Sequence, residues 1–120
     1  MAIHKTEDTE KLVQALTIFL ADTTILYYKT HAFHWNVEGA NFYGLHLMFE
    51  KFYTELWESM DEIAERIRAL GDKAPSSFAD LLSQSSIVES ETSPQPPGML
   101  NILRHDYAAL AKKAYAVCAI

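Results

Sequence analysis

The chain has 120 residues, of which 49% are hydrophobic and 22% charged, and its formal net charge at pH 7 is −6. These values are typical of one globular domain and exclude a disordered or fibrous chain. The ten Lys and Arg residues are scattered along the chain, so no basic patch indicates binding to nucleic acid or to an anionic membrane.

The sequence also limits where the protein works. Cys118 is the one cysteine, which excludes an intramolecular disulfide. The opening MAIHKTEDTE is too polar for a signal peptide, and no apolar run approaches the ~18 residues of a membrane span. We therefore expect a cytoplasmic protein with no membrane partner.

Apolar spacing predicts two long helices joined by a short turn. In the first, from about Asp8 to Asn36, apolar residues recur three, four and seven positions apart without Pro or Gly. Residues 37–40 interrupt the pattern, which resumes after Asn41, a candidate N-cap, and continues until Gly71 provides a stop. A connection this short indicates an antiparallel helical hairpin.

Residues 71–98 have a different composition, because they contain all four prolines and many serines. We expect a long crossover in which only residues 78–82 form a short helix. Pro97 suits the first turn of a third long helix, whose apolar stripe still continues where the sequence stops at Ile120. The predicted fold class is therefore all-α, a helix bundle.

The second predicted helix carries four candidate metal ligands: His46, Glu50, Asp61 and Glu65. They form two i,i+4 pairs, and at ~100° per residue all four lie within ~100° of one another, away from the main apolar stripe. His46 and Asp61 are nevertheless ~22 Å apart along the axis at ~1.5 Å per residue. The two pairs could meet if a second copy of the helix crossed antiparallel on a two-fold axis.

Three further residues fit such an arrangement. Trp57 and Ala64 lie between the two pairs on the same sector, as a large anchor and a small residue at a dimer seam would. His34 ends the first helix, and the hairpin can bring its imidazole beside His46. Imidazoles combined with carboxylates suit iron, manganese or zinc.

Other interpretations remain open from spacing alone. A histidine on an apolar helix is more often a hydrogen-bonded structural residue, and acids four apart are usually a solvated face. We interpret His31 as a polar neighbour of the site and His4 and His105 as surface residues. The tyrosines Tyr27, Tyr28, Tyr43 and Tyr53 are interpreted as packing residues rather than redox relays.

The stretches HAFHWNVEGANFYGLHLMFEKF and SMDEIAERIRALG resemble the Dps family of miniferritins, the DNA-binding proteins from starved cells. The resemblance runs from about Thr9 through the third helix and implies a ferritin-like bundle, with residues 1–120 forming a single domain. It further implies a dodecameric ferroxidase that oxidises Fe²⁺, typically with hydrogen peroxide, stores ferric iron and protects DNA under oxidative stress.

Carried over by residue, the resemblance makes His34 and His46 iron ligands from one subunit and Asp61 and Glu65 ligands from its neighbour. Glu50 stands where the family has Asp or Glu, and is expected to reach the iron directly or through water. Trp35 matches the family tryptophan beside the site. The expected occupant is iron, as a di-iron site. Since metal binding needs neutral imidazoles, uptake should fall below roughly pH 6.

The sequence departs from the family in two respects. The fourth helix is missing, so we expect a C-terminally incomplete domain whose cage assembly is in question. The N-terminus offers only Lys5 and Lys11 among acids, so we expect weak or no DNA binding, with nucleoid association as the remaining option. Two alternative functions stay open: a DNA-compacting structural protein, and a truncated helical module with a vestigial metal site.

Overall fold

The structure is a computed structural model that describes residues 6 to 120, and it forms a rod of helices measuring 57 × 24 × 22 Å. Its elements are α1 (Glu7–Asn36), α2 (Phe42–Ala69), α3 (Phe78–Gln84) and α4 (Pro96–Cys118). No strand occurs in this part of the chain, which confirms the predicted all-α class. The predictions for His4 and Lys5 lie outside the described residues.

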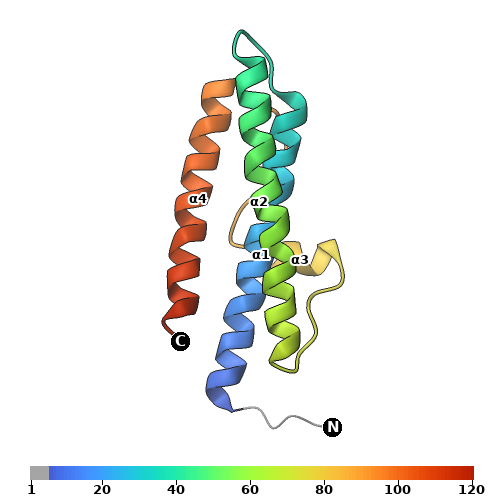
Figure 1. Cartoon of the computed structure of the whole chain (residues 1–120), viewed down its shortest axis with the longest axis vertical. Helices are drawn as coiled ribbons and strands as arrows, with labels where there is room; N and C mark the ends of the chain where they lie inside the picture. The colour runs from blue at the N-terminus through green and yellow to red at the C-terminus, as the bar shows by residue number, and fades with distance from the viewer. Residues whose placement is uncertain (1–5) are drawn as a thin grey trace.

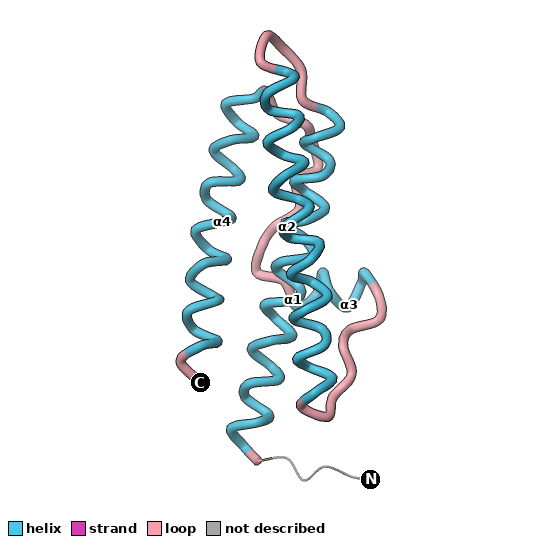
Figure 2. Tube along the Cα trace, in the orientation of Figure 1, coloured by secondary structure: helices cyan, strands magenta, loops and turns pink. Residues whose placement is uncertain are grey.

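Helix α1 is the central element of the rod. It contacts each of the other three helices, and α2 and α4 both run opposite to it (Figure 1). The crossover after α3 climbs back along the rod before α4 descends (Figure 2). The expected hairpin of α1 and α2 is thus confirmed, and the short crossover helix extends two residues further than predicted.

The hairpin turn is formed by residues 37–41. Gly39 has φ +105°, a left-handed conformation that favours glycine, and its carbonyl accepts a hydrogen bond from the Phe42 N–H at 3.1 Å. Asn41 occupies the N-cap position of α2, but its side chain makes no capping bond. The prediction that Asn41 caps the helix is therefore wrong in this respect, because its backbone (φ −98°, ψ 21°) lies outside the extended region that capping side chains use.

A buried carboxylate fixes the crossover to α1. Asp22 is fully buried and accepts hydrogen bonds from the Ser85 hydroxyl, the Ser86 N–H and hydroxyl, and the Ile87 N–H, at 2.6 to 3.3 Å. The crossover, which has little helical structure of its own, is thereby held at one place on the rod.

A second buried polar contact joins α4 to α1. The Lys29 ammonium donates to the Asp106 carboxylate at 2.5 Å, and both side chains are about nine-tenths buried. Burying a charge is costly unless it is paired, so this contact favours one register between the two helices.

Two apolar clusters fill the rod. One lies beside the hairpin turn and α4 and includes Leu26, Phe33, Phe49, Leu56, Met99 and Leu103. The other lies toward the opposite end of the hairpin and comprises Leu16, Leu20, Ile63 and Ile67. Burying each large apolar side chain contributes ~1.5–3 kcal/mol to the free energy of folding, so the first cluster stabilises the end of the rod that carries the hairpin turn. The candidate histidines lie at this end of the rod.

Candidate functional site

Two histidines meet at the end of the hairpin. His34, in the last turn of α1, is buried, and His46 lies in α2 with its side chain partly exposed. Their rings stack with centroids 3.7 Å apart and planes inclined by 16°. The expectation that the turn brings His34 beside His46 is confirmed.

Each of these rings is oriented by the other residue's main chain. His34 Nδ1 lies 2.7 Å from the His46 carbonyl oxygen, and His46 Nδ1 lies 2.7 Å from the His34 carbonyl oxygen. A carbonyl can only accept, so each Nδ1 must carry the proton that it donates. In the neutral form this leaves Nε2 of both rings with a free lone pair, which is the nitrogen available to a metal ion.

Aromatic rings surround this pair. The Phe42 ring stacks on the His46 ring with centroids 4.9 Å apart, and the Tyr53 and His34 rings pack edge to face with centroids 5.1 Å apart. Trp35, the residue expected beside the site, follows His34 directly and is 54% exposed. Phe42 and Tyr53 therefore each cover part of one imidazole ring, while His46 keeps some exposure to solvent.

His31 belongs to the same group of rings. It lies between Tyr53, stacked at 3.8 Å, and Trp35 at 4.1 Å, and its Nδ1 is 2.9 Å from the Tyr27 hydroxyl. Burial, and to a smaller extent the nearby His34, hold the pKa of His31 below its ordinary value of 6.5. Burial likewise raises the pKa of Tyr27 and of Tyr53. The sequence identified His31 as a neighbour of the site but gave no indication of this stack.

The three candidate carboxylates lie on the exposed side of α2. Glu50, Asp61 and Glu65 are all exposed, and Asp61 borders a surface hollow of about 680 Å³ that Trp57 and Ala64 also line. Trp57 itself is 59% exposed. Among residues 6 to 120 no group of three or more His, Cys, Asp or Glu side chains is close enough to hold a metal ion. One chain thus brings the two histidines together and leaves Asp61 and Glu65 apart from them.

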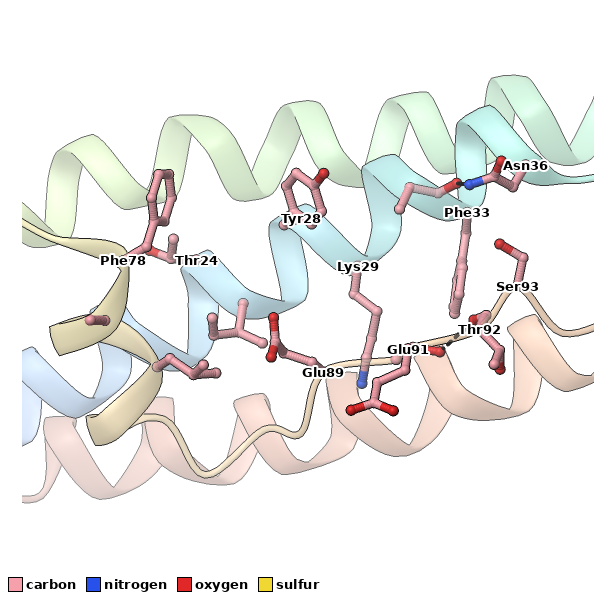
Figure 3. A pocket seen from close by; sticks show the side chains of 15 residues that line it. Thr24, Tyr28, Lys29, Phe33, Asn36, Phe78, Glu89, Glu91, Thr92 and Ser93 are labelled. Atoms are coloured by element: carbon pink, nitrogen blue, oxygen red, sulfur yellow. Dashed lines mark hydrogen bonds between the residues drawn. The ribbon is translucent and has the colours of Figure 1, made fainter.

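A second cavity, of about 590 Å³, lies between α1, α3 and the crossover. Tyr28, Phe33 and Phe78 provide much of its apolar lining, and Figure 3 shows Lys29 extending from α1 toward α4 past Glu91. The Lys29 ammonium is already paired with Asp106, so it is not available to a ligand. Neither Lys29 nor Asp22 was singled out from the sequence, because partners 77 and 63 residues away leave no local pattern.

None of the described helices is both long enough and apolar enough to cross a membrane. His105, interpreted as a surface residue, is exposed in the structure.

Comparison with known proteins gives consistent results. Residues 13–120 match the ferritin-like domain family. The chain is 39% identical over 98 residues to DNA protection during starvation protein 2 of Bacillus anthracis, an alignment that covers 82% of this chain and 67% of that protein. It is 34% identical over 106 residues to the DNA protection during starvation protein of Brevibacillus brevis, an alignment that covers 88% of this chain and 71% of that protein.

Solved structures agree with these relatives. A Dps protein from Bacillus brevis superposes with a TM-score of 0.91 at 32% identity, covering 95% of this chain and 76% of the other. A Dps protein from Vibrio cholerae superposes with a TM-score of 0.90 at 29% identity, covering 98% of this chain and 77% of the other. That protein is described as a member of a superfamily of ferritin-like diiron-carboxylate proteins.

Proposed function

The chain belongs to the Dps, or miniferritin, family of ferritin-like proteins, and on this premise we propose that it is a ferroxidase that takes up Fe²⁺, oxidises it with hydrogen peroxide and stores the ferric product. Protection of DNA, the role named in its relatives, would follow from removing both reactants of hydroxyl-radical formation. The net charge of −6 gives no support to a role through tight DNA binding.

The observation that carries the proposal is the stacked pair of His34 and His46. Two Nδ1 atoms held by main-chain carbonyls leave an Nε2 lone pair on each of two adjacent rings, so both imidazoles already have the tautomer that a divalent ion requires. Imidazole alone would suit several metals. Adding carboxylates gives the mixed ligand set that suits iron.

The carboxylates are proposed to come from a second copy of the chain. Asp61 is ~22 Å along α2 from His46, so it serves a different site from the histidines of its own chain. Across a two-fold axis, Asp61 and Glu65 of one subunit would face His34 and His46 of the other, with Glu50 nearby. Trp57 is exposed on this sector of α2, as an uncovered interface residue would be.

The reaction consumes its substrates in a defined ratio. Two Fe²⁺ ions each give up one electron, and hydrogen peroxide accepts both electrons together with two protons to form two water molecules. The Fe³⁺ then hydrolyses, releases protons and deposits as ferric oxyhydroxide. Pairing two electrons with one peroxide is what prevents release of hydroxyl radical.

The test is anaerobic titration with Fe²⁺ followed by peroxide, comparing wild type with His46→Ala and Asp61→Ala. Both variants should lose iron oxidation. A mixture of the two, dissociated and reassembled, should recover part of the activity, because one of the two sites in each mixed dimer then has all its ligands.

Glu55→Ala is the matched control, since Glu55 is also an exposed acid on α2 but lies on the opposite sector from His46. It should oxidise iron as wild type does. Full activity in Asp61→Ala, or no recovery in the mixture, would contradict a shared site. An assembly larger than a dimer, with a dodecamer as the expected form, is checked by measuring the mass in solution.

A further inference from the structure

The cavity between α1, α3 and the crossover is separate from the histidine pair. Its described lining residues all belong to these three segments, and neither His34 nor His46 is among them. Its volume of about 590 Å³ lies within the ~300–1,000 Å³ of cavities that hold small organic molecules. The crossover is anchored just before this wall, because residues 85–87 donate hydrogen bonds to the buried Asp22 carboxylate. The cavity is therefore formed before any ligand binds.

Aromatic side chains provide much of the cavity wall. Phe33 is buried, whereas Tyr28 is 60% exposed and Phe78 80% exposed. Figure 3 shows the rings of Tyr28 and Phe78 projecting in the same direction, one from α1 and one from α3. Large apolar side chains that remain exposed around a cavity leave surface that a ligand can cover. Because ring faces pack well with other rings and attract organic cations, this wall favours a ligand with an aromatic body.

The charge at the cavity is negative. Glu89 and Glu91 line it from the crossover, and Figure 3 shows the Glu89 side chain on the side of the crossover that faces α1. Lys29 is the one basic residue among the described lining residues, and its ammonium is paired with Asp106. Among residues 6 to 120, no hydrogen bond or ion pair engages the Glu89 carboxylate. An unpaired carboxylate favours a cationic ligand over an anionic one.

We propose that this cavity binds an arylalkylammonium ion, an organic cation whose charge is attached to an aromatic body. The aromatic body contacts the rings of Tyr28, Phe33 and Phe78, and the ammonium lies beside the Glu89 carboxylate. The rings alone would accept any apolar molecule of suitable size, and the carboxylate alone would accept any cation. Their combination selects a ligand that has both features. This binding requires neither iron nor the two histidines, so it does not depend on the proposed iron oxidation.

The test uses three compounds that share a naphthyl body and differ in charge: naphthylmethylammonium, naphthylmethanol and naphthoate. Methyl-labelled full-length protein, in the assembly that it forms in solution, is titrated with each compound at pH 7 and followed by NMR. Signals of Ile25 and Leu82, which line the cavity, should shift and saturate, whereas those of Leu100 on α4 should not.

The order of the three affinities reports the charge preference. For a ligand of about 12 heavy atoms, the dissociation constant of the ammonium compound should be ~0.1–1 mM. One charge a few ångströms from a carboxylate near solvent should make this compound bind ~5-fold more tightly than the neutral alcohol. Naphthoate should bind most weakly, because Glu89 repels it.

Two substitutions separate the contribution of the charge from that of the rings. Glu89→Gln should weaken binding of the ammonium compound ~5-fold and leave binding of the alcohol unchanged. Phe78→Ala should weaken binding of all three compounds by ~2- to 10-fold. The matched controls are Glu10→Gln, at an exposed acid of α1 outside the cavity, and Tyr115→Ala, at a 79% exposed ring on α4. Both controls should bind as wild type does.

The proposal is supported if the ammonium compound binds most tightly and loses this preference in Glu89→Gln but not in Glu10→Gln. It is overturned if the ammonium compound binds no more tightly than naphthoate, or if ~5 mM of it leaves the Ile25 and Leu82 signals unmoved. Equal affinity of wild type and Glu89→Gln for the ammonium compound would also overturn it. A protein that binds this cation but oxidises no iron would contradict only the proposed function, and the reverse result would contradict only this binding site.

Discussion

The bond between Asp22 and the crossover gives the sharpest prediction of stability. Asp22→Ala removes one carboxylate that receives four hydrogen bonds from residues 85–87. The loop would then lose the acceptor that fixes it on α1. We expect the protein to stay folded but with a markedly lower free energy of unfolding.

The size of the loss follows from the individual bonds. A hydrogen bond to a charged group contributes a net ~1.5–3 kcal/mol, but four such bonds do not add in full. Ser86 is exposed, so water replaces the carboxylate there, and the Ile87 N–H keeps the Ser85 hydroxyl as an acceptor at 3.0 Å. One to two bonds are therefore lost in effect, and we expect a cost of ~3 kcal/mol for Asp22→Ala and ~1 kcal/mol for Asp22→Asn, which keeps one acceptor oxygen.

Urea unfolding at fixed protein concentration measures the free energy of unfolding of both variants. Glu58→Ala, which removes an exposed acid on α2, is the control and should change that free energy by less than ~0.5 kcal/mol. Hydrogen exchange should show faster exchange of the Ser86 and Ile87 amides in Asp22→Ala. A loss below ~1 kcal/mol, or unchanged exchange at these two amides, would refute the reasoning.

Two further predictions concern buried or partly buried charges. Lys29→Met leaves Asp106 buried without its partner and should lower the free energy of unfolding in urea by ~3–5 kcal/mol. The double variant Lys29→Met/Asp106→Leu should be clearly more stable than Lys29→Met, and equal stabilities would contradict this. In the metal-free protein, His31 should titrate by NMR below the ordinary histidine value of ~6.5. The folded state then binds this proton more weakly than the unfolded chain does, so the free energy of unfolding should decrease as the pH drops below ~6.5. His31→Gln should make this decrease smaller, whereas His105→Gln, at an exposed position, should leave it unchanged.

The helices were predictable because their signals are local. The apolar spacing and Gly71 located three long helices to within one or two residues, and Gly71 has the positive φ that its role as a stop requires. Asn41 shows the limit of such signals. A capping residue type was present at the right position, but the tight turn before it set a backbone conformation from which its side chain does not cap.

The site was predictable in part. The resemblance and the hairpin together placed His34 beside His46, as the structure confirms. Their reciprocal bonds to main-chain carbonyls, and the stack around His31, depend on how two helices are rotated against each other, which spacing along one helix does not determine. The meeting of these histidines with Asp61 and Glu65 remains a prediction, because it involves two chains.

The reciprocal bonds between His34 and His46 also bear on which sequences could keep this site. Both acceptors are main-chain carbonyls, so no third side chain has to be preserved to keep the rings in their tautomers. The exposed residues 38, 40 and 41 between the two helices are therefore free to change, whereas buried Val37 packs in the first apolar cluster and position 39 needs a residue that tolerates the conformation of Gly39. The number of residues is not free, because adding or removing one would rotate α2 about its axis and separate each imidazole from its carbonyl. Natural and designed variants should thus differ in the composition of this turn far more readily than in its length.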